Sequence, residues 1–199
     1  MTSRARWSRI FVLALSAAAL APAVRGAEGG PQAAGDGEAG AVRRAFVAGL
    51  RGFHDFNRTN VIAAAEAVPE ESYVFRATPE VRSFGQLVGH VADTLYFACA
   101  GMRGEPNPNE KDHRPGVVAE DSIERNRTTR AELVAAVKAA FAYCDEAFAL
   151  AEAAPVVAGE EGQGAFHASL AVYHTGLHYG NMVTYMRLLG IVPPSSAGP

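Results

Sequence analysis

Apolar side chains recur at three- and four-residue steps in four separate stretches of this chain, and no stretch shows a strand pattern of comparable strength. This period is typical of an amphipathic α-helix, which buries its apolar face against a core. The first stretch covers residues 41–68 and ends before Pro69. The fourth covers residues 165–189, where Gly190 fits a C-terminal cap. The pattern predicts long helices packed on one another.

Two capping boxes mark the starts of the second and third helices. In a capping box, a serine or threonine is followed three residues later by glutamine or glutamate, and each side chain accepts a hydrogen bond from the other residue's backbone N–H. Ser83 with Gln86 and Thr129 with Glu132 have this spacing. Each pair directly precedes an apolar stripe, so we expect a helix to begin at both places.

The segment 104–121 between these two helices is a connection. It holds three prolines and seven charged residues, a composition that disfavours a helix. Its length is enough for a crossover between helices that run parallel. The sequence therefore predicts an all-α four-helix bundle over residues 41–196.

The N-terminal segment 1–27 has the layout of a signal peptide. Three arginines, the last of them Arg9, precede an apolar run at 10–21 and then a stretch of small residues. About 12 apolar residues are too few for a membrane-spanning helix, which needs about 20, so we expect no stable membrane anchor. Residues 28–40 are mostly glycine, alanine and acid, which predicts a flexible leader. We expect an exported protein, periplasmic or extracellular.

Charge and cysteine content exclude several classes of function. Without the four arginines of the segment 1–27, 14 of the 18 basic residues remain against 21 acidic ones, a net charge of −7. Nucleic acid and anionic membrane surfaces both require a basic protein surface, so neither is an expected partner. Two cysteines exclude a four-thiolate zinc site, so any metal ligands must be histidines or carboxylates.

Three histidines are the candidate metal ligands. His174 and His178 are four residues apart, so both imidazoles project from one helical face. His90 comes three residues after Leu87, on the buried side of the second helix, so it points inward from a different helix. Taken alone, His90 also fits a core histidine that is hydrogen-bonded to a carbonyl or to Asp93. Three imidazoles leave a coordination position open, as in catalytic sites. No glutamate follows His174, so the zinc-protease motif is absent.

Further polar residues lie near this set. Asp93 is one helical turn from His90, and Asn181 and Tyr185 continue the His174 stripe. Asp93 and Tyr185 are the catalytic candidates, with a surface acid and a core tyrosine as the alternative interpretations. His167 is too far along its helix to be a ligand. The weaker candidates are His54 and Asn57, and His113 is expected to be solvated.

The stretch Tyr73 to His90 (YVFRATPEVRSFGQLVGH), the stretch His174 to Asn181 (HTGLHYGN) and the stretch Tyr185 to Pro194 (YMRLLGIVPP) resemble the DinB and YfiT-like superfamily. The likeness covers about residues 41–196. It implies a bundle in up-down-down-up order that holds a divalent metal, commonly nickel, zinc or iron, with three histidines. The ligand positions fall on His90, His174 and His178. Between the last two this chain has Thr-Gly-Leu, where the family often has Asp-Asn-Glu.

The implied topology places the second and third helices in parallel, so Cys99 and Cys144 would lie at similar depth, and a disulfide between them is a hypothesis. Two functions stay open. One is a metal-dependent enzyme, hydrolase-like or, by likeness to relatives that use small thiols, S-transferase-like, with a small-molecule substrate. The other is a non-catalytic, stress-related bundle that binds a metal or a small ligand. A homodimer is compatible with both.

Overall fold

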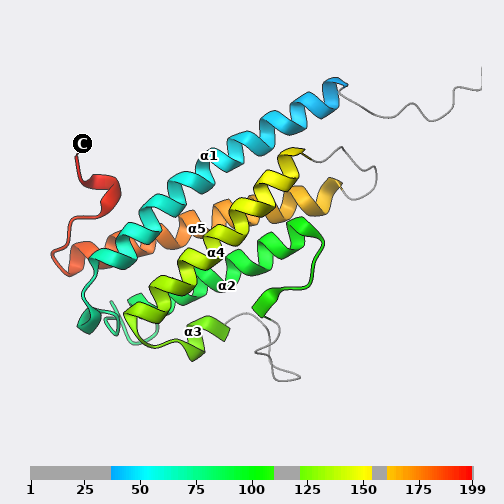
Figure 1. Cartoon of the computed structure of the whole chain (residues 1–199). Coiled ribbons are helices and arrows are strands. Elements are labelled where there is room, and N and C mark those ends of the chain that lie inside the picture. Colours follow the sequence, from blue (N-terminus) through cyan, green and yellow to red (C-terminus); the bar gives the residue numbers. More distant parts are fainter. Residues whose placement is uncertain (1–36, 110–121, 154–160, 199) are drawn as a thin grey trace, which may run out of the picture. The chain divides into compact units, whose positions relative to one another are not determined.

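The computed structural model describes residues 37–109, 122–153 and 161–198, which form a bundle of four long helices (Figure 1). The helices are α1 (Glu38–Ala67), α2 (Phe84–Arg103), α4 (Arg130–Ala153) and α5 (Glu161–Leu188). A short helix α3 (Ser122–Asn126) precedes α4, and single 3-10 turns, η1 (Glu70–Ser72) and η4 (Pro194–Ser196), follow α1 and α5. These described segments contain no strand.

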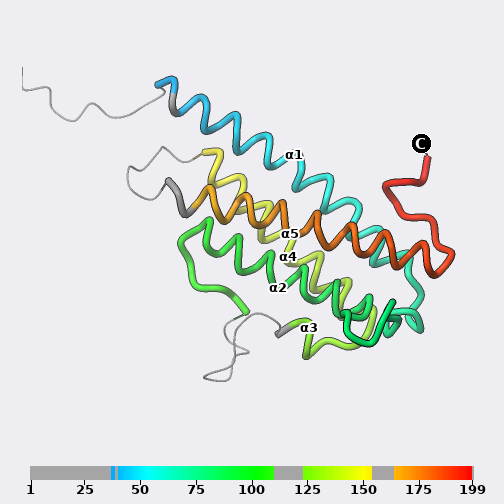
Figure 2. The backbone as a smooth tube through the Cα atoms, turned by 180° about the vertical axis from the view of Figure 1, so that it is seen from behind, coloured from blue at the N-terminus to red at the C-terminus, as the bar shows by residue number. Residues whose placement is uncertain are grey.

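The helices run up, down, down and up along the chain. Both views of the backbone show α2 and α4 running in one direction and α1 and α5 in the other (Figures 1 and 2). α2 packs against α4 and α5, and α1 packs against the same two helices. α1 and α2 therefore occupy opposite corners of the bundle. The predicted fold class is confirmed.

The helix ends follow the predicted capping signals. Gln86 N–H donates to Ser83 Oγ and Ser83 N–H donates to Gln86 Oε1, at 3.2 and 3.0 Å. The same reciprocal pair joins Thr129 and Glu132. At the end of α5, Gly190 adopts a φ of 74°, and the next N–H, from Ile191, reaches back to the carbonyl of Met186. Glycine adopts this left-handed conformation more readily than any other residue, so Gly190 closes the helix as predicted.

Two features differ from the sequence-based expectation. α1 begins at Glu38, within the segment predicted as leader, because an acidic residue in the first turn interacts favourably with the helix dipole and the following residues are compatible with a helix. Helix α3 was not predicted, since five residues are too few for a recognisable period. The predicted signal peptide and most of the leader lie outside the described residues and stay predictions.

The core lies between the four helices and is crossed by one disulfide. Its largest buried side chains include Phe84, Phe141 and Phe148, which are no more than 1% exposed. Cys99 of α2 and Cys144 of α4 are fully buried and form a disulfide with a Cα–Cα distance of 5.2 Å. The structure therefore contains the hypothesised pair, and it links the two parallel helices.

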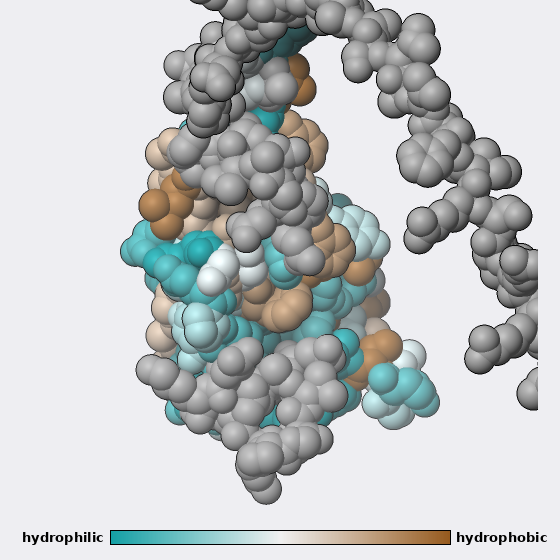
Figure 3. All heavy atoms as spheres, turned by 90° about the vertical axis from the view of Figure 1, so that its right-hand side faces the viewer, coloured by the Kyte–Doolittle hydropathy of each residue, from teal (hydrophilic) through white to brown (hydrophobic). Residues whose placement is uncertain are grey.

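Apolar residues also occur on the surface. Figure 3 views the right-hand end of Figure 1, and on this face hydrophobic residues lie among hydrophilic ones. Among the described residues, no helix combines the length and the apolar character that crossing a membrane requires.

Candidate metal centre

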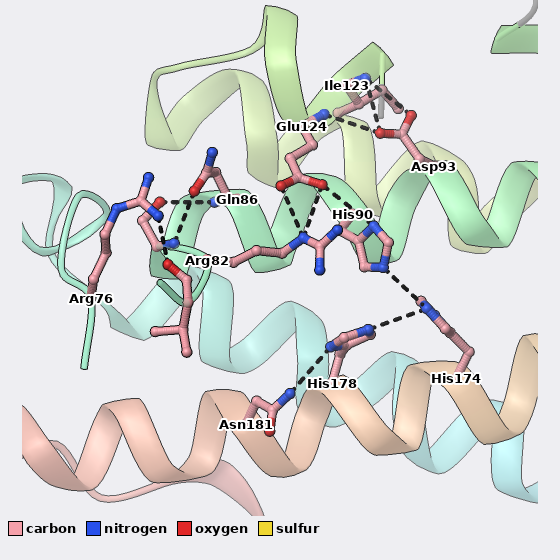
Figure 4. A network of polar contacts seen from close by, with 12 residues as sticks. Arg76, Arg82, Gln86, His90, Asp93, Ile123, Glu124, His174, His178 and Asn181 are labelled. Carbon is pink, nitrogen blue, oxygen red and sulfur yellow. Dashed lines mark hydrogen bonds and ion pairs between the residues drawn. The ribbon is translucent and has the colours of Figure 1, made fainter. Parts of the chain in front are cut away.

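The three predicted histidines meet between α2 and α5 (Figure 4). His90 projects from α2, and His174 and His178 project from one face of α5. His174 Nε2 lies 3.1 Å from His90 Nε2 and 3.2 Å from His178 Nε2. The three candidate ligand atoms all lie within 4.8 Å of one another. The helix period of α5 and the packing of α2 against it thus bring the three imidazoles to one point.

The spacing of these nitrogens suits a shared divalent ion. At a metal–nitrogen distance of about 2.1 Å, tetrahedral ligands are about 3.4 Å apart. The observed separations of 3.1 and 3.2 Å are close to that value. The donor set of three imidazoles suits zinc, nickel and iron alike.

Burial keeps two of the imidazoles neutral. Burial is the largest cause, and charge repulsion from the neighbouring histidines and Arg82 adds to it, so that the pKa of His174 and of His178 is lowered to about 4. Glu124 partly opposes this shift at His178. Only a neutral imidazole has a lone pair to offer a metal. The site is not closed, because the side chain of His90 remains 14% exposed.

Glu124 of α3 contacts the outer edge of His90. Its Oε2 lies 3.4 Å from His90 Nδ1, the ring nitrogen that faces away from the other two histidines. Arg82 Nε donates to both carboxylate oxygens of Glu124, at 2.9 and 3.1 Å (Figure 4). A carboxylate at Nδ1 favours the tautomer with its proton on Nδ1, which leaves the Nε2 lone pair free for a metal.

Asp93 and Gly89 hold α3 in this position. The backbone N–H groups of Ile123 and Glu124 donate to the Asp93 carboxylate, at 3.0 and 3.1 Å. A Cβ on Gly89 would lie only 2.6 Å from the Cα of Glu124, so the missing side chain permits the close approach of α3 to α2. Asn109 Nδ2 also donates to this carboxylate, at 3.2 Å. Asp93 therefore holds α3 and Asn109 in place, and its catalytic role stays a prediction.

Two residues of α5 extend the site. Asn181 Nδ2 lies 3.3 Å from His178 Nδ1. A flip of this amide, which exchanges its nitrogen and oxygen, would place the oxygen there, where it could accept a hydrogen bond from the Nδ1–H of a metal-bound ring. The hydroxyl of Tyr185 donates to the carbonyl oxygen of Arg82 at 2.8 Å, in a largely buried position. It thus anchors the backbone of Arg82, and a catalytic role for Tyr185 also stays a prediction.

The remaining candidate residues lie elsewhere. His54 is buried beside Asp145 of α4, at 3.0 Å, and burial lowers its pKa. Asn57 donates to the carbonyl of Val172. His167 stacks edge-on against Phe97 and is not among the three clustered histidines. His113 lies outside the described residues.

Comparison with known protein families found a match. The model of the DinB superfamily matches residues 54–182, well over half of the chain. The chain belongs to the DinB superfamily. Searches of curated proteins and of solved structures found no match. The matched region of this DinB chain contains the three histidines and Glu124.

The sequence did not reveal Glu124 or Arg82 as part of the site. Glu124 is far from His90 in the sequence and lies in a helix of only five residues. Arg82 precedes α2 and resembles any other surface arginine in the sequence. The capping box at Ser83 was the only nearby signal, and it indicated a helix start with no hint of a ligand.

Proposed function

We propose that this DinB superfamily protein is an exported metal-dependent enzyme that acts on a small molecule, with hydrolase-like or thiol S-transferase-like chemistry. The observation that carries the proposal is the cluster of three histidines on a side of the bundle that solvent reaches. In it, His174 Nε2 lies 3.1 and 3.2 Å from Nε2 of His90 and His178, and all three ligand atoms lie within 4.8 Å of one another. Zinc, nickel or iron would be held by His90, His174 and His178. The site offers no feature that selects among them.

A divalent ion in such a site lowers the pKa of a bound water or thiol and so supplies a nucleophile near neutral pH. Several residues of the chain would support metal binding. Glu124 fixes the orientation of His90, and Arg82 holds Glu124 in turn. Burial keeps His174 and His178 unprotonated, so they need not lose a proton before they bind the ion.

Export is supported by two independent features. The first is the arrangement of arginines and apolar residues at the N-terminus. The second is the Cys99–Cys144 disulfide, because disulfides persist chiefly in oxidising compartments. An exported enzyme would not meet the cytosolic pool of small thiols, which favours hydrolysis over S-transfer.

One observation favours the second candidate function, a non-catalytic bundle that binds a metal or a small ligand. Both catalytic candidates are engaged by backbone groups: Asp93 accepts hydrogen bonds from α3, and Tyr185 donates to Arg82. Neither side chain is therefore directed to the metal centre as a proton donor or acceptor.

Metal content of the untagged protein tests the proposal. Elemental mass spectrometry is expected to find about one zinc, nickel or iron per chain, and His90→Ala, His174→Ala and His178→Ala should each lose it. His167→Ala is the matched control and should keep it, since this histidine is on α5 but outside the cluster. Absence of metal after reconstitution would remove the proposal. If the protein holds a metal but does not turn over ester, amide or thiol substrates, the result would favour the non-catalytic bundle that binds a metal or a small ligand.

A further inference from the structure

The outer face of α1 bears a stripe of exposed apolar side chains. Val42, Phe46, Phe53 and Phe56 are 64%, 51%, 65% and 54% exposed. They follow one another at steps of four, seven and three residues, which keeps them on one side of a helix. Figures 1 and 2, taken from opposite sides, both show α1 along one edge of the bundle. The stripe therefore continues for about half of the helix on an edge of the fold.

The charged residues of α1 lie on a different side of the helix. Three arginines reach toward α4: Arg43 donates to the carbonyl of Ala151, Arg51 pairs with Glu152, and Arg58 pairs with Asp145. Asp55 pairs with Arg58, and Arg44 is seven residues before Arg51 and shares its side. The exposed apolar stripe from Val42 to Phe56 therefore contains no charged side chain. Three exposed phenylalanines on one uncharged helix face are more than isolated surface residues.

Two glycines form a shallow gap within this stripe. Gly49 and Gly52 are exposed, and a Cβ built on either would meet nothing within 4 Å. They lie between Phe46 and Phe53 along the helix. The same patch thus offers both bulky side chains and a flat stretch of backbone. Such a patch is complementary to a copy of itself turned about a two-fold axis, as isologous dimer interfaces are.

We propose that two copies of this chain associate through the outer faces of their α1 helices, which run antiparallel, with Phe46 and Phe53 of each copy packed over the glycines of the other. A phenylalanine offers about 200 Å² of surface, so three that are half to two-thirds exposed contribute about 340 Å² per chain and about 700 Å² per pair. With Val42, Ala45 and the glycine backbone, complete burial of this surface would bring the total to about 1,000 Å², the lower limit for a specific interface.

The mass of the full chain in solution tests this interface, measured by light scattering and sedimentation over about 1 to 100 μM. The expected result is a dimer. Phe53→Asp should weaken association at least about tenfold, because it buries a charge in the interface. Phe166→Asp is the matched control: it changes an equally exposed phenylalanine on α5 and should leave the dimer intact. Circular dichroism should show unchanged helix content in both variants.

A third variant distinguishes a specific interface from non-specific hydrophobic association. Gly49→Leu adds apolar surface but fills the gap, so the proposed interface weakens, whereas non-specific association would strengthen. A monomeric wild-type chain at about 100 μM would overturn the proposal, as would a dimer that survives Phe53→Asp. A monomer that binds neutral lipid vesicles through Phe53 would also overturn it and assign the face to a membrane surface.

Discussion

The carboxylate of Glu124 lies 3.4 Å from His90 Nδ1, on the edge of the ring opposite to the nitrogen that meets His174. This relation joins a five-residue helix to the metal centre. A carboxylate at that position orients a ligand and raises its basicity, and the loss of such a partner typically costs about 10- to 100-fold in metal affinity. Glu124 contacts Nδ1, whereas the nitrogen that faces the other histidines is Nε2. The contribution of Glu124 is therefore to position His90.

Glu124→Gln is therefore expected to weaken zinc binding about 10- to 100-fold while the bundle stays folded. The amide keeps the shape of the side chain but removes the negative charge that favours a proton on Nδ1. Competition titration against a chelator of known affinity measures the change. Glu146→Gln is the control, because Glu146 is an exposed carboxylate paired with Arg103 and distant in the sequence from the histidines. Equal affinities for all three proteins would contradict the positioning role.

Gly89→Ala tests the close approach of α3 to α2. The added Cβ would lie 2.6 Å from the backbone of Glu124, so α3 must move away and take its carboxylate from His90. We expect lower metal affinity, together with a loss of about 1–3 kcal/mol in the free energy of unfolding from the strained packing. Urea unfolding and the chelator titration report the two effects.

Gly180→Ala supplies the matched control for this substitution. It adds a Cβ in α5 that meets nothing within 4 Å. The expected result is a gain of about 0.5–1 kcal/mol in stability, because alanine is the better helix former. If Gly89→Ala were as well tolerated as Gly180→Ala, the contact between Gly89 and α3 would not matter to the site.

The stability of the metal-free protein should fall as the pH falls from about 6.5 to 4. The pKa of His174 and His178 is lowered to about 4 by burial, whereas in the unfolded chain it is near 6.5. In that window the unfolded state binds protons that the folded state does not, so protonation favours unfolding. Above about pH 6.5 both states carry neutral imidazoles and the effect is absent.

Urea unfolding at several pH values, with chelator present, measures this dependence. The variant His174→Asn/His178→Asn should show a clearly shallower slope, and the lowered pKa of His54 would account for part of the slope that remains. An identical pH dependence in the variant and in the wild type would contradict the assignment. Loss of bound metal over the same range is a second expected readout, because protons compete for the ligands.

Reduction of the Cys99–Cys144 disulfide should destabilise the bundle by about 4 kcal/mol. The bond joins cysteines separated by 45 positions. In the chain-entropy model, reduction opens this loop and gives the unfolded chain more conformational entropy, which stabilises the unfolded state by about that amount. The double variant Cys99→Ala/Cys144→Ala, compared with the oxidised protein by urea unfolding, measures it. Two free thiols in the denatured, unreduced protein would show that the bond does not form.

The sequence by itself determined the helices and the pair of His174 and His178, because both depend on local spacing. The apolar period predicts the long helices, the pairs Ser83/Gln86 and Thr129/Glu132 mark two of their starts, and Gly190 marks an end. His174 and His178 share a face of any helix through them, since four residues nearly complete a turn. His90 was a candidate because it points inward from another helix, and the family likeness implied it as the third ligand together with the direction of the helices.

Only the tertiary structure decided what surrounds the histidines. Glu124 reaches His90 from a distant part of the chain, through a helix too short to have a period. Asp93 is one turn from His90 and was a catalytic candidate, but its carboxylate accepts hydrogen bonds from α3. The pairing of Cys99 with Cys144 depends on which faces of α2 and α4 meet. Each of these contacts is set by how helices distant in sequence pack together, and sequence spacing holds no information about that packing.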